Sequence, residues 1–330
     1  MPDCQEGRKG VAPREKNMEL TIKSIMTIPR LSTLLASSMH FCVDALCLCC
    51  LYLTTGNVYD YLIYNVLAFL TQPLTGIVVD KIKGKYNVLF TAVVMLLMAT
   101  AMSVLTPDYK VVVAVMLGVG NSLFHVWGGR EVAVVTNNDV RALGVFVSPG
   151  VLGLAVGAVL CSWELLFGLL VAIGILTTLH YCLANRTGAD GGEVVAIKNK
   201  YAVILMVAIC AVVVMRSYLA GGFSKGVESG GGIMVVVAAL VAMSGKILGG
   251  FLARIFKNYL TAFLVFAAVS VACLFAKDYV GGAVFVGLFA VNCTMPLTLH
   301  WTEKLLPGRE GFSFGLLAAS LMPPYLLSFL

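Results

Sequence analysis

Eleven long apolar runs separated by short polar connectors constrain this 330-residue chain more than any other feature. A helix needs about 20 consecutive apolar residues to cross the hydrocarbon core of a bilayer. Because 59% of the residues are hydrophobic and only 12% are charged, the connectors leave no room for a sizeable soluble domain. The sequence therefore predicts an all-α polytopic membrane protein. The predicted spans are 31–54, 60–79, 86–106, 110–128, 142–161, 163–184, 201–221, 232–252, 258–276, 279–300 and 311–330.

Positive charge is distributed unevenly over the connectors. Of the 23 Lys and Arg residues, eighteen lie in residues 1–30 or after the even-numbered spans, and three lie after the odd-numbered spans. The remaining two, Arg216 and Lys246, lie inside spans. Positively charged connectors face the cytoplasm, so the N-terminus and the even-numbered connectors are predicted to be cytoplasmic. The compact connectors and the lack of a processing signal suit a bacterial inner membrane.

The polar segments divide the chain into four parts. Residues 1–30 have no apolar core followed by a cleavage site, so they are predicted to be a retained cytoplasmic arm that Pro29 turns into the first span. The longest internal connector is rich in Gly, Asp and Asn, which is typical of a flexible linker. The predicted parts are the arm at 1–30, a six-helix N-terminal half at 31–184, a linker at 185–200 and a C-terminal half of about five helices at 201–330.

The first span contains an ionisable pair, His40 and Asp44. Ionisable groups inside a membrane span are costly and usually face a bundle interior or a wet cavity. Spaced i, i+4, the two side chains share one helix face and can touch. A histidine beside a carboxylate titrates near neutral pH, so the pair is predicted to be a proton-responsive site that faces the substrate. A packing pair between helices is the alternative.

Several stretches resemble the major facilitator superfamily and, within it, the fosmidomycin-resistance type of drug efflux transporter. They are the second-span loop GIVVDKIKGK at 76–85, GVGNSLFHVWGGRE in span four, FVSPGVLGLAVGAVL in span five, an arginine in span seven, NCTMP in span ten and the connector LLPGREGFSFGLL. The resemblance implies a major-facilitator-like bundle of two pseudo-symmetric halves, with six spans and about five spans. Against this fold the sequence lacks the twelfth helix. A natively shortened protein, an incomplete sequence, and a partner or lipid that covers the place of this helix are the alternatives. In the second half, Arg254 stands where the loop signature has an aspartate.

The resemblance assigns roles to individual residues. A conformational latch is implied for Gly76, Asp80, Lys81, Lys85, Arg130 and Glu131, and proton coupling for His40 and Asp44. Spans one, four, seven and ten line the central cavity in this superfamily, which makes Asn121, His125, Arg216, Tyr218, Asn292 and Thr294 candidate substrate-binding residues. Plainer interpretations exist for three of these spans. In span four His125 can bond a neighbouring carbonyl, in span seven Arg216 can extend to the outer surface, and in span ten Pro296 can kink the helix without any ligand contact.

The resemblance implies a proton-coupled secondary transporter of a small organic solute or drug that works by alternating access, in the efflux direction by antiport. An importer of a small organic anion and a non-transporting scaffold or lipid-handling protein are the alternatives. The sequence contains no Ser/His or His-Glu-x-x-His arrangement of the kind that would suggest an enzyme. The ten cysteines lack paired metal-ligand spacing. The expected partners are a small-molecule substrate, the proton and the bilayer, with no nucleic acid, cofactor or metal.

Overall fold

The computed structural model describes residues 13–55, 57–82, 85–184, 197, 200–228 and 230–327, and every regular element among them is a helix. In these residues nine helices are long and apolar enough to cross a membrane, and a bent helix pair makes a tenth. The prediction of an all-α polytopic membrane protein is therefore confirmed. The first half contains α1 (Pro13–Thr54), α2 (Val58–Asn65), the π-helix η1 (Val66–Leu70), α3 (Gln72–Lys81), α4 (Lys85–Leu105), α5 (Lys110–Val135), α6 (Val140–Val147), α7 (Pro149–Val159) and α8 (Trp163–Ala184). The second half contains α9 (Ala202–Glu228), α10 (Gly232–Leu252), the 3-10 helix η2 (Ala253–Ile255), α11 (Tyr259–Ala276), α12 (Ala283–Cys293), α13 (Met295–Leu305), α14 (Glu310–Ala319) and α15 (Met322–Leu327).

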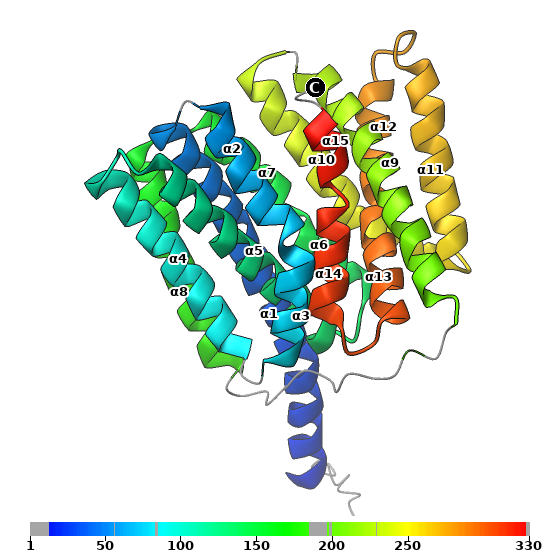
Figure 1. The fold of residues 1–330 in the computed structure, drawn as a ribbon. Coiled ribbons are helices and arrows are strands. Elements are labelled where there is room, and N and C mark those ends of the chain that lie inside the picture. The colour runs from blue at the N-terminus through cyan, green and yellow to red at the C-terminus, as the bar shows by residue number, and fades with distance from the viewer. Residues whose placement is uncertain are drawn as a thin grey trace, which may run out of the picture.

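The first helix is longer than predicted. α1 runs without interruption through Pro29, so the prediction that this proline turns the arm into the first span is wrong. Its N-terminal part projects from one end of the bundle (Figure 1). We call this end, where α3 ends and α14 begins, the arm side. The linker predicted at 185–200 lies almost wholly outside the described residues.

Prolines divide four of the predicted spans. Span two bends by 41° between η1 and α3, beside Pro73. Spans five, ten and eleven each consist of two helices, and Pro149, Pro296 and Pro323 lie in the first turn of the second one. Proline has no N–H to donate, so it is tolerated in a first turn but leaves the preceding carbonyls without their usual partners. The break beside Pro296 agrees with the kink that the sequence suggested in span ten, whereas the breaks in spans two, five and eleven were not predicted.

The fourth span extends further than its apolar run. α5 ends at Val135, so Arg130 and Glu131, which were predicted to lie in a connector, are buried inside the helix. Gly128 and Gly129 make room for this, because a Cβ at either position would collide with the ring of Phe146 or Phe314. The helix therefore continues where hydropathy alone predicts its end.

The two halves lie side by side, and three of the helix pairs between them make the closest contact (Figure 1). α14 packs against α3, and α10 packs against α6 and α7. Glycines allow two of these contacts near the arm side: a Cβ at Gly76 would collide with the backbone of Gly311, and a Cβ at Gly250 would collide with the backbone of Val140. The halves are therefore sealed against each other at the arm side by backbone-to-backbone packing.

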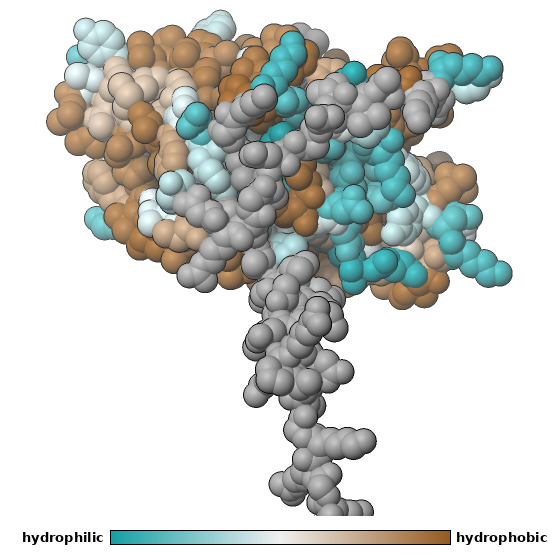
Figure 2. Space-filling view, turned by 90° about the horizontal axis from the view of Figure 1, so that it is seen from below, coloured by the Kyte–Doolittle hydropathy of each residue, from teal (hydrophilic) through white to brown (hydrophobic). Residues whose placement is uncertain are grey.

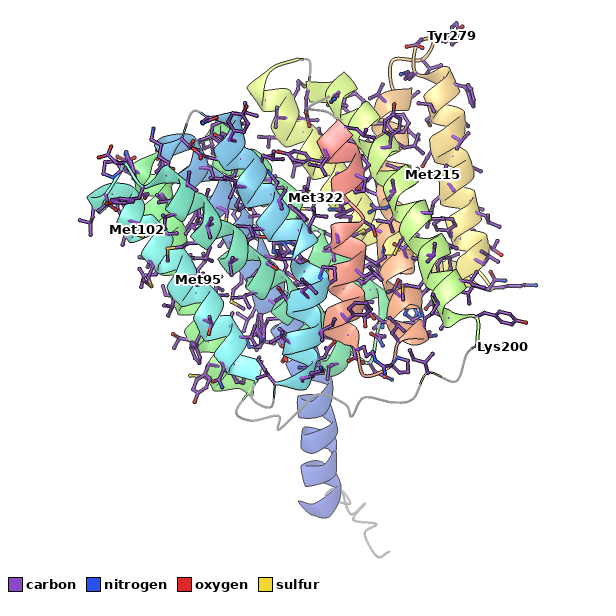
Figure 3. All side chains as sticks on the ribbon, in the orientation of Figure 1. Met95, Met102, Lys200, Met215, Tyr279 and Met322 are labelled. Carbon is purple, nitrogen blue, oxygen red and sulfur yellow. The ribbon has the colours of Figure 1, made fainter. Side chains whose placement is uncertain are left out.

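The outer surface agrees with a protein surrounded by lipid. Figure 3 shows side chains projecting from the perimeter of the bundle, where Met215 is 68% exposed, and Tyr279 at a loop tip is 89% exposed. Viewed from the arm side, hydrophilic residues gather on the end of the bundle, and apolar residues form its rim (Figure 2). An apolar rim around polar ends is the surface that a bilayer requires.

Candidate functional site

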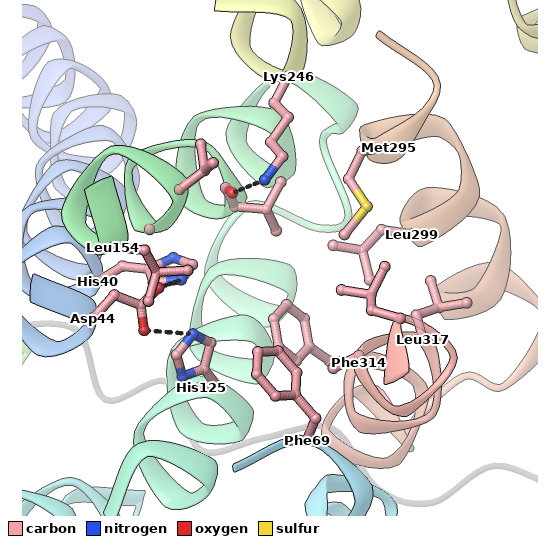
Figure 4. Close-up of a pocket in the computed structure, with 15 residues that line it drawn as sticks. His40, Asp44, Phe69, His125, Leu154, Lys246, Met295, Leu299, Phe314 and Leu317 are labelled. Atoms are coloured by element: carbon pink, nitrogen blue, oxygen red, sulfur yellow. Dashed lines mark hydrogen bonds and ion pairs between the residues drawn. The ribbon is translucent and has the colours of Figure 1, made fainter. Parts of the chain in front are cut away.

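A buried cluster of ionisable side chains joins α1 and α5 at the centre of the molecule (Figure 4). Nε2 of His40 lies 3.3 Å from Oδ2 of Asp44, and Nε2 of His125 lies 3.4 Å from Oδ1 of the same carboxylate. The amide nitrogen of Asn121 donates to Asp44 Oδ1 over 3.0 Å. The structure therefore brings together four of the residues that the sequence singled out, with the Asp44 carboxylate at the centre of the other three.

The second nitrogen of each imidazole fixes what the cluster can do. Nδ1 of His40 lies 2.7 Å from the Phe146 carbonyl oxygen, and Nδ1 of His125 lies 2.9 Å from the Asn121 carbonyl oxygen. A carbonyl can only accept, so both Nδ1 atoms carry hydrogen. Each neutral imidazole then points the lone pair of Nε2 at the Asp44 carboxylate. Attraction in this geometry requires a proton or another cation between the imidazole and carboxylate atoms.

The break in span five supplies part of this geometry. The last carbonyls of a helix lack partners within it, and α6 ends at Val147 because Pro149 follows. Of these free carbonyls, that of Phe146 accepts from His40, and that of Val147 lies 3.3 Å from Nζ of Lys246. One helix break thus holds two ionisable side chains in place.

Glycines in α7 bring that helix onto α1. Cβ atoms at Gly153 and Gly157 would collide with the carbonyl oxygens of Phe41 and Ala45, so glycine at both positions allows the two backbones to pack closely. A Cβ at Gly150 would collide with both the His40 imidazole and the Asp44 carboxylate. Only glycine at this position leaves the pair its present geometry.

The cluster faces a cavity of about 200 Å³ between the two halves (Figure 4). His40, Asp44 and His125 line one wall, and Lys246 reaches the edge of the same cavity from α10, where its ammonium meets the Val147 carbonyl. The remaining lining is apolar and comes from both halves: Phe69, Val147, Val151, Leu154, Met295, Leu299, Phe314, Leu317, Ala318 and Leu321. The cavity is thus an apolar space with ionisable groups contributed by both halves.

Of the substrate-binding residues predicted in the C-terminal half, Arg216 is the one that keeps unsatisfied polar atoms in the interior. It is only 7% exposed, and its Nε and Nη2 atoms have no hydrogen-bond partner. The Asn292 amide donates to the Leu288 carbonyl, and the Thr294 hydroxyl donates to the Val291 carbonyl, so both are bound within their own helix segment. Tyr218 is 67% exposed and does not line the cavity.

Three of the residues predicted to form a latch, Gly76, Asp80 and Arg130, lie at the arm-side contact between α3 and α14. Asp80 accepts hydrogen bonds from the backbone N–H groups of Gly311, over 2.8 Å, and Phe312, over 2.9 Å. Both donors belong to the first turn of α14, so Asp80 of one half caps a helix of the other. Nε of Arg130 lies 3.3 Å from Asp80 Oδ1. Glu131 is buried nearby in α5, Lys81 is exposed, and the Lys85 side chain lies outside the described residues.

The other arm-side contact between the halves, where α10 packs against α6, is built differently. Asp139 caps α6 with its own side chain, accepting from the backbone N–H of Arg141, and also pairs with the Arg141 guanidinium. Burial raises the pKa of Asp139, but the hydrogen bonds and charge of Arg141, with the charge of Arg254, outweigh it and hold the pKa below its ordinary value. Arg254 therefore acts near an aspartate supplied by the N-terminal half.

Three functional features were missed from the sequence. Lys246 was noted only as a charge inside a span, although an ionisable residue in such a position is itself a signal. Pro149 was a visible helix-breaking signal in span five. Glu303 was not considered because the tenth helix was predicted to end at residue 300, yet it is 0% exposed and neither carboxylate oxygen has a hydrogen-bond partner among the described residues.

Comparisons with known proteins agree on the fold. No protein-family model matches the sequence, and no curated protein is significantly similar to it. Among solved structures, the fucose:proton symporter of E. coli is similar with a TM-score of 0.60 and 12% identity, covering 90% of each chain. A bacterial homologue of the iron transporter ferroportin, in an outward-facing state, is similar with a TM-score of 0.61 and 16% identity, covering 92% of this chain and 91% of that one. The chain therefore has the fold of major facilitator superfamily transporters.

Proposed function

We propose that the protein is a proton-coupled secondary transporter of a small organic solute, working by alternating access. The observation that carries this proposal is the buried cluster of His40, Asp44 and His125, which faces a cavity between two helical halves. In this mechanism the halves rock about a central site. A scaffold or lipid-handling protein would have no need of an ionisable cluster buried at the centre, where burial is costly.

We propose that the structure represents the state in which the cavity opens away from the arm side. The halves are packed together through Gly76 and Gly250 at the arm side, where the positive charge of the connectors favours the cytoplasm. The similar ferroportin homologue was captured in an outward-facing state, which supports the same assignment. Asp80 then acts as a latch that must release α14 before the cavity can open to the cytoplasm.

We assign the cluster to protons. A nitrogen from each imidazole and an oxygen of Asp44 lie within 4.8 Å of one another, so the three groups could instead share a small metal cation. Lys246 lies at the edge of the cavity, and Arg216 adds a second positive charge in the same half. Positive charge in a low-dielectric interior disfavours a further divalent cation. Protons can be accepted singly and released when the cavity changes sides.

The experiment that tests this function begins with a thermal-shift screen in detergent against organic acids, amides, sugars and drugs. A solute that stabilises the protein is then followed in proteoliposomes under an imposed pH gradient. We expect solute flux to follow the gradient, and Asp44→Asn to abolish this dependence. The matched control is Asp108→Asn, because Asp108 is exposed in a connector. Gradient-driven flux that persists unchanged in Asp44→Asn would refute the role of the cluster.

The same screen includes Zn²⁺, Mn²⁺ and Fe²⁺. Stabilisation by one of these ions that is lost in His125→Ala would show that the cluster binds metal and would overturn the assignment to protons. The direction of flux relative to the gradient separates efflux by antiport from uptake together with protons.

A further inference from the structure

Two cationic side chains lie in the interior of the C-terminal half without a negative partner. Arg216 is almost fully buried in α9, and Lys246 projects from α10 to the edge of the cavity. Among the described residues neither forms an ion pair. Within the described part of the chain, the Lys246 ammonium has one partner, the Val147 carbonyl at 3.3 Å, and Nε and Nη2 of Arg216 have no hydrogen-bond partner. The two positive charges are close enough to repel each other.

Such an arrangement needs an anion. Burying a charge without a partner costs several kcal/mol or more, and a guanidinium in a membrane span ordinarily meets a carboxylate, a phosphate or another anion. Among the described residues that line the cavity, Asp44 is the one acid, and it is already held by His40, His125 and Asn121. Asp44 attracts Lys246 but forms no ion pair with it, so neither cation has a carboxylate partner of its own among the residues that the structure describes.

Resting on the proposed function, we infer that Lys246 and Arg216 form the anion-binding side of the transport site, and that the substrate is a small organic monoanion with an apolar body. The cavity is lined by aliphatic and aromatic side chains such as Phe69, Leu154 and Phe314. A volume of about 200 Å³ admits a body of roughly ten non-hydrogen atoms, and burial of that body contributes to affinity. The anionic group lies toward Lys246.

The charges also set the sign of coupling to protons. The ionisable groups that line the cavity are His40, Asp44 and His125 of the N-terminal half and Lys246 of the C-terminal half. Arg216 lies close enough to Lys246 to repel it, and Cys47 and Tyr64 lie behind Asp44. With both imidazoles neutral, the two cations and one carboxylate leave one net positive charge, and each added proton increases it. An anion therefore binds the protonated site more tightly, and by reciprocity the anion increases proton affinity. Proton and anion then cross in the same direction.

The test measures binding in detergent, separately from transport. The probes are straight-chain monocarboxylates from acetate to decanoate and benzoate, each paired with its uncharged primary amide. The variants are Lys246→Met and Arg216→Met, and the control is Lys225→Met in the last turn of α9. We expect at least one carboxylate, but not its amide, to raise the melting temperature and to bind with proton uptake. Either cavity variant should weaken that binding by about 10- to 100-fold.

Without any anion, both cavity variants should melt at a higher temperature than the native protein, because each removes an unpaired buried charge. This readout separates an anion site from a structural role, since loss of a structural contact would lower the melting temperature. Equal stabilisation by amide and acid, binding that the variants leave unchanged, or no stabilisation by any carboxylate overturns the inference. Proton-driven flux of an uncharged solute would overturn the inference and leave the proposed function standing. Binding of a carboxylate without any flux would refute the proposed transport function and leave the inferred anion site standing.

Discussion

Asp80 is the residue whose removal should most directly shift the balance between the two access states. Its carboxylate belongs to α3 and accepts two backbone hydrogen bonds from the first turn of α14, so it joins one half to the other. Arg130 holds the carboxylate in place within its own half. The substitution Asp80→Ala therefore removes both polar contacts across this interface and leaves the helices themselves intact.

The magnitude follows from the two hydrogen bonds. Replacing a helix N-cap by alanine costs about 0.5–2 kcal/mol, and a hydrogen bond to a charged group contributes about 1.5–3 kcal/mol. A cost of about 2 kcal/mol to the arm-closed state is a middle value, and it lowers the ratio of arm-closed to arm-open molecules about 30-fold. The α14 helix loses only the cap of its first turn, so the free energy of unfolding should change by less than this cost.

Distances between spin labels on the two halves can measure the ratio. Asn87→Cys at the start of α4 and Lys257→Cys beside η2 place exposed labels at the arm side of each half, in a background without native cysteines. We expect Asp80→Ala to move most of the distance distribution to longer values, and Lys81→Ala, which removes an exposed neighbouring charge, to leave it in place. A ratio that changes less than about threefold in Asp80→Ala would refute the latch.

Three further substitutions test other parts of the structure. Gly150→Ala should abolish pH-dependent flux, because its Cβ would collide with the imidazole and carboxylate of the cluster, whereas Gly168→Ala, which meets open space, should leave flux unchanged. Gly250→Ala should lengthen the spin-label distances at the arm side, because its Cβ would collide with the backbone of α6; unchanged distances would contradict the seal. Glu303→Leu should stabilise the protein by about 1–3 kcal/mol in thermal unfolding, because it removes a buried carboxyl group whose oxygens have no hydrogen-bond partner among the described residues, whereas Glu164→Leu at an exposed position should have no such effect.

The helices were predictable because the length of an apolar run is a local property. The proximity of His40 and Asp44 was predictable for the same reason, since i, i+4 spacing fixes it within one helix. Predicting that Asn121 and His125 lie close to this pair depended on the resemblance to a known fold, because α5, which carries them, is far from α1 in the sequence. The structure places them as that resemblance implied.

What the sequence did not reveal depends on contacts between distant residues. The Lys246 ammonium is held by a carbonyl 99 residues away, which is free because Pro149 interrupts span five. The end of α5 was misplaced because Arg130 is held inside by Asp80, and hydropathy counts it only as a charge. Asn292 and Tyr218 lie on helices that line such cavities, but the rotation of each helix decides where a side chain points.

The distribution of charge between the halves explains how two helical bundles can act as one carrier. Asp44 and its imidazoles belong to the N-terminal half, whereas the unpaired cations Lys246 and Arg216 belong to the C-terminal half. Under the proposed assignment, an empty cavity and a cavity holding one proton and one monoanion carry the same net charge. The halves can therefore close equally well over the empty cavity and over the cavity that holds both ligands. Closing removes water from the cavity, so any added net charge is costly. A proton bound alone raises the charge and opposes closure, so the two halves approach each other fully only when the anion has joined the proton. The free energy of closing the cavity therefore depends on its net charge. This dependence is enough to couple the movement of the proton to that of the anion.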